Sequence, residues 1–110
     1  MDTLARLERT IAERRAGAAP GSYVAQLQAR GLPVMARKLG EEAVEAAIAS
    51  LAGSREELVG EAADLLFHLL VLLSEKGIAL ADVLAELDRR EGVSGLAEKA
   101  ARTEKAGSAG

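Results

Sequence analysis

The sequence predicts an all-α protein, a bundle of four to five helices. Apolar residues make up 49% of the chain, yet it contains only one Tyr and one Phe. The core must therefore be built from Leu, Val, Ile and Ala, a composition that suits packed helices better than sheets. Apolar residues also recur at helical spacing in successive segments that end near Gly or Pro. The length of 110 residues fits a single domain with one modest core.

The first helix is expected over residues 3–15, because Leu4, Leu7 and Ile11 recur at helical spacing. Residues 16–21 follow with two Gly and a Pro, a composition typical of a flexible connection.

Two further helices are predicted from their end signals. Ser22 can cap a short helix that stops at Gly31. Pro33 suits the first turn of the next helix, which we expect to run to about residue 51 before Gly53 ends it.

Ser54 followed three residues later by Glu57 is a capping-box pattern, which predicts a long helix from residue 55 to about residue 76. Gly77 is expected to end it. Apolar residues nearly surround this helix, so we expect it to be central and buried.

The C-terminal part is predicted to hold one regular helix over residues 80–90, from apolar residues at i, i+3, i+4 and i+7. Residues 94–102 add one or two turns. Residues 103–110 have nothing to bury and are predicted to form a disordered tail, so the expected domain covers residues 1–102.

Composition also bounds the function. The net charge of −3 and pI near 5.2 give no reason to expect nucleic-acid binding. The absence of cysteine removes disulfides, thiolate catalysis and Cys-based zinc sites. The N-terminus lacks the pattern of a signal peptide, and the longest apolar run is about half the length that crosses a bilayer. We expect a cytoplasmic protein without a membrane partner.

Acidic residues gather on two neighbouring helices. On the helix that starts at Pro33, a 100° projection places four charged residues within one arc: Lys38, Glu41, Glu42 and Glu45. Alone, this arc is the charged face of an ordinary surface helix. On the next helix a narrow stripe holds Glu57, Glu61, Asp64, His68 and Glu75. Because few basic residues are available to pair with these acids, the stripe must face either water or a cation.

Packing the two stripes together would gather Glu41 or Glu42 with Glu45, Glu61 and Asp64. Two carboxylates about 6 Å apart repel by roughly 3 kcal/mol at an effective dielectric near 20, so a divalent cation is needed to hold several of them. All-oxygen ligands select Mg²⁺ or Mn²⁺. The implied chemistry is metal-assisted attack of water on a polyphosphate.

The remaining roles are less sharply indicated. One of Glu41, Glu42 and Glu45 is expected to orient or deprotonate the water, and the sequence does not choose among them. Glu57 is assigned mainly to its capping box, and a place in the site is the alternative. His68 is expected either to bond a ligand carboxylate or to be satisfied in the core, and it cannot build a zinc site or a triad alone.

The strings Lys38-Leu39-Gly40-Glu41-Glu42-Ala43-Val44-Glu45 and Glu61-Ala62-Ala63-Asp64 match the pattern E-E-x-x-E followed by E-x-x-D. In this joint pattern the chain resembles the MazG-like all-α nucleoside-triphosphate pyrophosphohydrolases. Within that superfamily it is most similar to the phosphoribosyl-ATP pyrophosphatases, from residue 4 to residue 102. Residues 82–87 and 94–102 add to this resemblance, and the latter string is the most discriminating.

The resemblance implies hydrolysis of 1-(5-phosphoribosyl)-ATP to 1-(5-phosphoribosyl)-AMP and pyrophosphate, the second step of histidine biosynthesis. It implies a metal-dependent homodimer. Metal ligands would come from Glu42, Glu45, Glu61 and Asp64, with Glu41 close by. The cations for substrate phosphates would be Lys38, Lys99 and Arg102, which are otherwise plain surface charges.

Two alternatives stay open. One is a broad-specificity (d)NTP pyrophosphatase of the same superfamily, which would use the same acids. The other is a non-catalytic helical module that dimerises through its Leu-rich faces, in which Glu45→Gln and Asp64→Asn would be neutral or stabilising and Mg²⁺ would not change the melting temperature.

Overall fold

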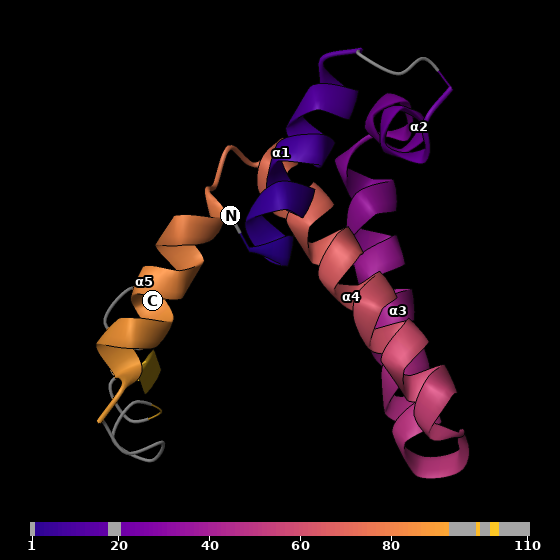
Figure 1. Cartoon of the computed structure of the whole chain (residues 1–110), viewed down its shortest axis with the longest axis vertical. Coiled ribbons are helices and arrows are strands. Elements are labelled where there is room, and N and C mark those ends of the chain that lie inside the picture. The colour runs from indigo at the N-terminus through magenta and orange to yellow at the C-terminus, as the bar shows by residue number, and fades with distance from the viewer. Residues whose placement is uncertain (1, 18–20, 93–98, 100–101, 104–110) are drawn as a thin grey trace. The chain divides into compact units, whose positions relative to one another are not determined.

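The structure, a computed structural model of the chain, describes residues 2–17, 21–92, 99 and 102–103. Its helices are shown in Figure 1: α1 (Thr3–Arg15), α2 (Tyr23–Arg30), α3 (Leu32–Ala52), α4 (Arg55–Glu75) and α5 (Leu80–Arg90). The described residues include no strand, so the all-α prediction is confirmed for them. The chain divides into two compact parts, Met1–Leu80 and Ala81–Gly110.

Side-chain caps begin three of the helices. Ser22 Oγ accepts a hydrogen bond from the backbone N–H of Ala25 at 3.1 Å, and Ser54 Oγ accepts one from Glu57 at 3.1 Å. Both caps were predicted from the sequence. Asp2 caps α1 in the same way, through a 2.8 Å bond from the N–H of Ala5. Each cap satisfies one of the backbone donors that a helix start leaves open.

Glycine turns separate the helices close to the predicted positions. Gly31 has φ of 92°, which a residue with a Cβ adopts only with strain, and it allows α3 to follow directly on α2. Pro33 is the second residue of α3, within the predicted first turn. Gly77 follows α4 with φ of 70°.

The core of the first part lies at one end of α4. Its buried residues come from α1, α2, the start of α3, the end of α4 and the start of α5: Ile11, Val24, Leu27, Met35, Leu70, Val71 and Leu80. An ion pair between Arg15 and Glu75 also links α1 to α4. Glu8 joins the same region, because its carboxylate accepts a 2.7 Å hydrogen bond from the N–H of Leu80.

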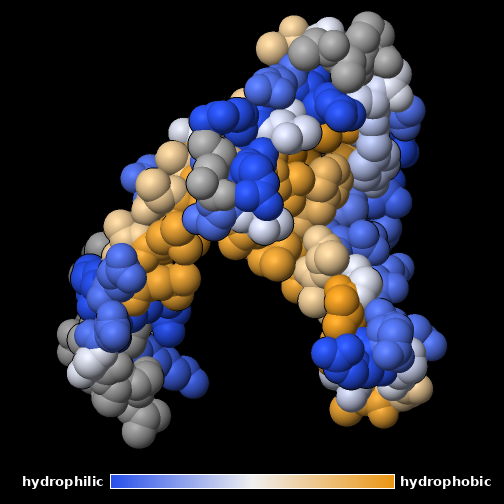
Figure 2. Space-filling view, viewed as in Figure 1, coloured by the Kyte–Doolittle hydropathy of each residue, from blue (hydrophilic) through white to orange (hydrophobic). Residues whose placement is uncertain are grey.

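Beyond this core, α3 and α4 continue side by side as an antiparallel pair joined at Gly53 and Ser54 (Figure 1). We call residues 42–66 of this pair the hairpin arm. Five of its large apolar residues are more than two-fifths exposed in the single chain: Val44, Ile48, Leu51, Val59 and Leu66. Figure 2 shows a face on which hydrophobic side chains run along α4.

The prediction that α4 is central and buried is therefore wrong for the chain by itself. In its second half α4 is packed by α1 as well as α3 and buries His68, Leu70 and Val71. In the hairpin arm α4 packs against α3, and Val59 and Leu66 remain 56% and 45% exposed. A helix that is apolar on nearly all sides needs neighbours on all sides, and the residues that the structure describes cover this part of α4 less fully than its second half.

The second part of the chain contains nearly all of α5. On α5, Glu86 pairs with Arg89 at 2.6 Å and with Arg90 at 3.1 Å, and these hydrogen bonds lower the pKa of Glu86 to about 2. From the predicted turns over 94–102, only Lys99 and Arg102 are described, and both are exposed. Residues 18–20 of the predicted connection and 104–110 of the predicted tail lie outside the described residues.

Candidate metal centre

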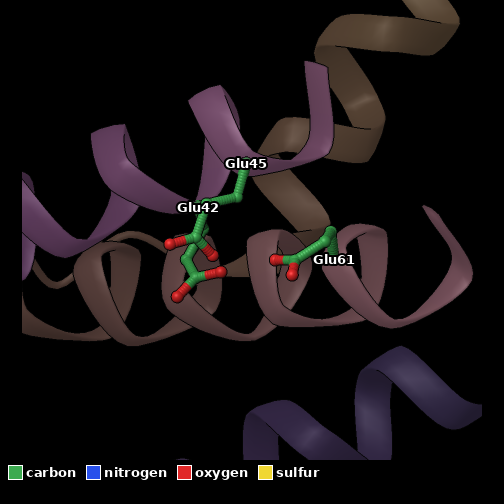
Figure 3. Close-up of side chains that lie close together, drawn as sticks. All are labelled: Glu42, Glu45 and Glu61. Carbon is green, nitrogen blue, oxygen red and sulfur yellow. The ribbon is translucent and has the colours of Figure 1, made fainter. Parts of the chain in front are cut away.

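Three carboxylates converge between the two helices of the hairpin arm. Glu42 and Glu45 project from α3, and Glu61 projects from α4 (Figure 3). One carboxylate oxygen from each residue lies within 4.8 Å of the other two. Glu42 and Glu61 are partly buried and Glu45 is exposed. We call these three residues the acidic cluster.

Local sequence explains how the acidic cluster forms. Glu42 and Glu45 are three residues apart, so they share one face of α3. The short connection after α3 reverses the chain direction, and Glu61 lies about as far after this turn as Glu45 lies before it. The packing of α4 against α3 therefore brings Glu61 level with the pair.

The cluster is short of positive charge and of hydrogen-bond donors. Among the described residues, no partner reaches the buried Oε2 atoms of Glu42 and Glu61. A hydrogen bond with Glu45, available only when one carboxyl carries a proton, is the largest cause that raises the pKa of Glu61 to about 7, followed by burial and the charge of Glu45. Burial raises the pKa of Glu42, and the charges of Glu45 and Asp64 add to this.

The other predicted site residues of the first part lie around the cluster. Asp64 falls outside the group of three, although its charge is near enough to raise the pKa of Glu42. Glu41 is exposed and pairs instead with Arg37 and with Lys38, each at 3.5 Å. This places Glu41 and Lys38 together beside the cluster.

His68 is buried, and its described hydrogen-bond partners are a backbone oxygen and a hydroxyl, not a carboxylate. Its Nδ1 lies 2.8 Å from the backbone oxygen of Asp64, and its Nε2 lies 3.0 Å from the hydroxyl of Tyr23. Because a carbonyl only accepts, Nδ1 carries a proton and donates it to the Asp64 oxygen. Phe67 packs edge-on against the imidazole at 5.2 Å between ring centroids. Tyr23 was missed at the sequence level, because it belongs to another helix.

A hollow of about 250 Å³ adjoins the cluster. Its walls are formed by the end of α3, the turn and the start of α4: Glu45, Ile48, Ala49, Ala52, Gly53, Glu57 and Glu61. Glu57 folds back over the turn, since a Cβ placed on Gly53 would lie 2.8 Å from Glu57 Oε2. The capping box predicted from the sequence already directs the Glu57 side chain back toward the helix start, but the hollow that it lines there was not predicted.

A larger hollow of about 470 Å³ lies at the core end of α4, against α1. Glu8 and Arg9 are its charged residues, and it shares no wall residue with the acidic cluster. The predicted cations Lys99 and Arg102 belong to the second part of the chain.

The acidic cluster fits a hard divalent cation. It offers only oxygen ligands, two of its oxygens have no hydrogen-bond donor among the described residues, and the pKa values of Glu42 and Glu61 are both raised, in part by the charge of Glu45. A Mg²⁺ or Mn²⁺ ion would neutralise the repulsion and use the unpartnered oxygens. None of the helices that the structure describes combines the length and hydropathy needed to cross a membrane.

Comparison with known proteins gives consistent matches. A family profile described as phosphoribosyl-ATP pyrophosphohydrolase matches residues 4–91. The phosphoribosyl-ATP pyrophosphatase of Erythrobacter litoralis is 67% identical over 102 residues, which cover 93% of this chain and 98% of the relative. The protein of the same name from Rhizorhabdus wittichii is 68% identical, over 91% of this chain and 94% of the relative. That from Novosphingobium aromaticivorans is 65% identical, over 93% and 95%.

Proposed function

This chain belongs to the phosphoribosyl-ATP pyrophosphohydrolase family, and from that premise we propose how it works. It hydrolyses 1-(5-phosphoribosyl)-ATP to 1-(5-phosphoribosyl)-AMP and pyrophosphate, in histidine biosynthesis. The reaction depends on Mg²⁺ or Mn²⁺ bound by Glu42, Glu45 and Glu61, with Asp64 beside them. One observation carries this assignment: carboxylate oxygens of Glu42, Glu45 and Glu61 lie within 4.8 Å of one another. Glu42 and Glu61 each also have a buried oxygen without a hydrogen-bond partner among the described residues.

A divalent cation in this position would supply positive charge to the phosphates and lower the pKa of a bound water. The protein's residues have separate tasks. Glu42 and Glu45 are the two predicted base candidates that lie in the cluster, and one of them orients the attacking water or takes its proton. Glu41 is less suited, because it pairs with Arg37 and Lys38. Lys38, Lys99 and Arg102 are proposed to stabilise charge on the leaving pyrophosphate.

The direct test is hydrolysis by the purified protein of phosphoribosyl-ATP, compared with a panel of dNTPs, with and without Mg²⁺. We expect pyrophosphate rather than orthophosphate, a strong preference for phosphoribosyl-ATP, and no activity in EDTA. Equal turnover of the dNTP panel would instead indicate a broad-specificity pyrophosphatase. Restored growth of a histidine-requiring strain that lacks this step provides the matching test in cells.

Two variants test whether activity depends on the acidic cluster or only on the surface charge of the arm. Glu45→Gln should abolish most of the activity, because the amide cannot supply a charged ligand oxygen. Glu56→Gln, an exposed change in the first turn of α4, should leave activity unchanged. Equal activity in both variants would contradict the proposed site.

We further propose that the enzyme is a cytoplasmic homodimer that covers the apolar face of the hairpin arm. A cysteine-free chain gives no sign of an oxidising compartment. On the arm, Val44 and Ile48 are 59% and 58% exposed and lie one turn apart, and Val59 and Leu66 are exposed on α4. An apolar face of this kind is typical of an obligate interface. A monomeric mass at micromolar concentration would exclude the dimer.

A further inference from the structure

The hollow beside the acidic cluster lies on one side of it, toward the turn between α3 and α4. Glu45 and Glu61 belong both to the cluster and to the hollow wall. Ala49 and Ala52 follow Glu45 along α3, and Gly53 and Glu57 complete the wall at the turn. A group bound to the cluster can therefore extend directly into the hollow.

The walls of this hollow do not suit a phosphate. Among the described residues, they carry the carboxylates of Glu45, Glu57 and Glu61 and no Lys or Arg. The proposed cation would offset the charges of Glu45 and Glu61, but Glu57 lies outside the acidic cluster, so its charge would repel a phosphate in the hollow. The remaining wall is apolar and is formed by Ile48, Ala49, Ala52 and Gly53. Such a surface favours an uncharged group that has hydroxyl donors for the carboxylates.

The opposite side of the cluster suits phosphates. Lys38 precedes Glu45 by two turns of α3, about 10 Å, and Ala52 follows it by the same number of turns. Lys38 Nζ lies 3.5 Å from Glu41 and keeps about a third of its side chain exposed. A substrate with its reacting phosphate at the cluster would direct its pyrophosphate toward Lys38 and its nucleoside toward the turn.

The size of the hollow agrees with part of a nucleoside. At about 30 Å³ per water, 250 Å³ holds about eight waters, which is more than a phosphate needs and less than the volume of a typical pocket for a whole ligand. A ribose ring with its hydroxyls is of this order.

Resting on the proposed function, we propose that this hollow binds the ribose next to the reacting phosphate and that Glu57 accepts hydrogen bonds from its 2′- and 3′-hydroxyls. Gly53 is part of this arrangement, because a Cβ there would displace the Glu57 carboxylate from the wall. Glu57 is thus a specificity-determining residue that selects ribonucleotides over deoxyribonucleotides. A site that binds a hydroxyl through a charged acceptor discriminates strongly against a substrate that lacks it.

The test compares two substrates: phosphoribosyl-ATP and its analogue made with 2′-deoxy-ATP in place of ATP. The full-length enzyme should prefer the first by about 10- to 100-fold in kcat/KM. In Glu57→Ala this ratio should fall toward one, through loss of kcat/KM on the ribonucleotide alone. Glu56→Ala is the matched control, since it removes a charge from the same helical turn but does not line the hollow. It should keep the full preference.

A second variant tests the hollow without removing a carboxylate. Ala52→Leu fills the space between the walls and should raise KM for phosphoribosyl-ATP while Mn²⁺ binding, measured by titration calorimetry, is unchanged. Normal KM in this variant would overturn the ribose assignment.

Three results separate failure of this inference from failure of the proposed function. An inactive wild-type enzyme, or full activity of Glu45→Gln, would contradict the function itself. An active enzyme whose ribose preference survives Glu57→Ala would overturn only the role of Glu57. Weaker Mn²⁺ binding, or fewer ions bound, in Glu57→Ala would show that the hollow holds a second cation instead of a sugar.

Discussion

Binding of Mg²⁺ or Mn²⁺ to the acidic cluster should release a proton at mildly acid pH. To test this, the cation-free protein is titrated with the metal at pH 6 and again at pH 8. Without the cation, hydrogen bonding with Glu45, burial and repulsion raise the pKa of Glu61 to about 7. Glu61 is then about 90% protonated at pH 6 and about 10% protonated at pH 8. A carboxylate must be ionised to bind the metal.

The expected release from Glu61 is therefore about 0.9 proton per cation at pH 6 and about 0.1 at pH 8. Titration calorimetry in two buffers of different ionisation enthalpy measures this number directly, because the heat from the buffer scales with the protons released. Glu61→Gln should remove the difference between the two pH values. An equal proton count at pH 6 and pH 8 in the wild-type protein would refute the reasoning.

The same pKa shift sets the sign of the pH dependence of stability. An unfolded Glu ionises near its reference value of about 4.5, whereas folded Glu61 holds its proton until about pH 7. The stability contributed by this raised pKa is complete below about pH 4.5 and is lost as the pH rises through about 7. The Tm measured in EDTA should therefore fall between pH 5 and pH 8. Saturating Mg²⁺ should make that fall smaller or reverse it.

The remaining predictions concern metal linkage, packing and assembly. A cation at 100 times its Kd should stabilise the wild type by about 2.7 kcal/mol, and thermal melts of Glu45→Gln should show no such gain. Tyr23→Phe removes the hydroxyl that hydrogen-bonds buried His68 and should cost about 1 kcal/mol in urea unfolding. Met35→Ala, at a fully buried core position, should cost about 2–5 kcal/mol in the same assay. Leu66→Glu should convert the proposed dimer to a monomer in sedimentation analysis, and an unchanged mass would exclude this face from the interface.

Helix positions were predictable because their signals are local. Ser22 and Ser54 offer side-chain oxygens to backbone N–H groups three residues away, and Gly31 and Gly77 occupy backbone conformations that other residues avoid. These interactions depend on neighbours in the sequence, so all five helix bounds lie within one or two residues of their predicted positions.

Side-chain partners across helices were not predictable in the same way. His68 bonds Tyr23, which lies 45 residues away in the sequence, and helical periodicity carries no information about that distance. Glu57 matches a capping-box pattern at the start of its own helix, and its side chain also lines the hollow. Gly53 leaves room there for the carboxylate. The exposure of Leu66 likewise depends on how far α1 extends along α4.

The sequence by itself determined where the described helices begin and end and that the acids of two of them share one face each, because the end signals and helical spacing are local. Only the tertiary structure decided which of those acids meet. The packing of α4 on α3 joins Glu61 to Glu42 and Glu45, while Glu41 turns toward Arg37 and Lys38. The reason is physical: spacing sets the direction of a side chain around its own helix, whereas the distance to a second helix depends on the register at which the two surfaces pack.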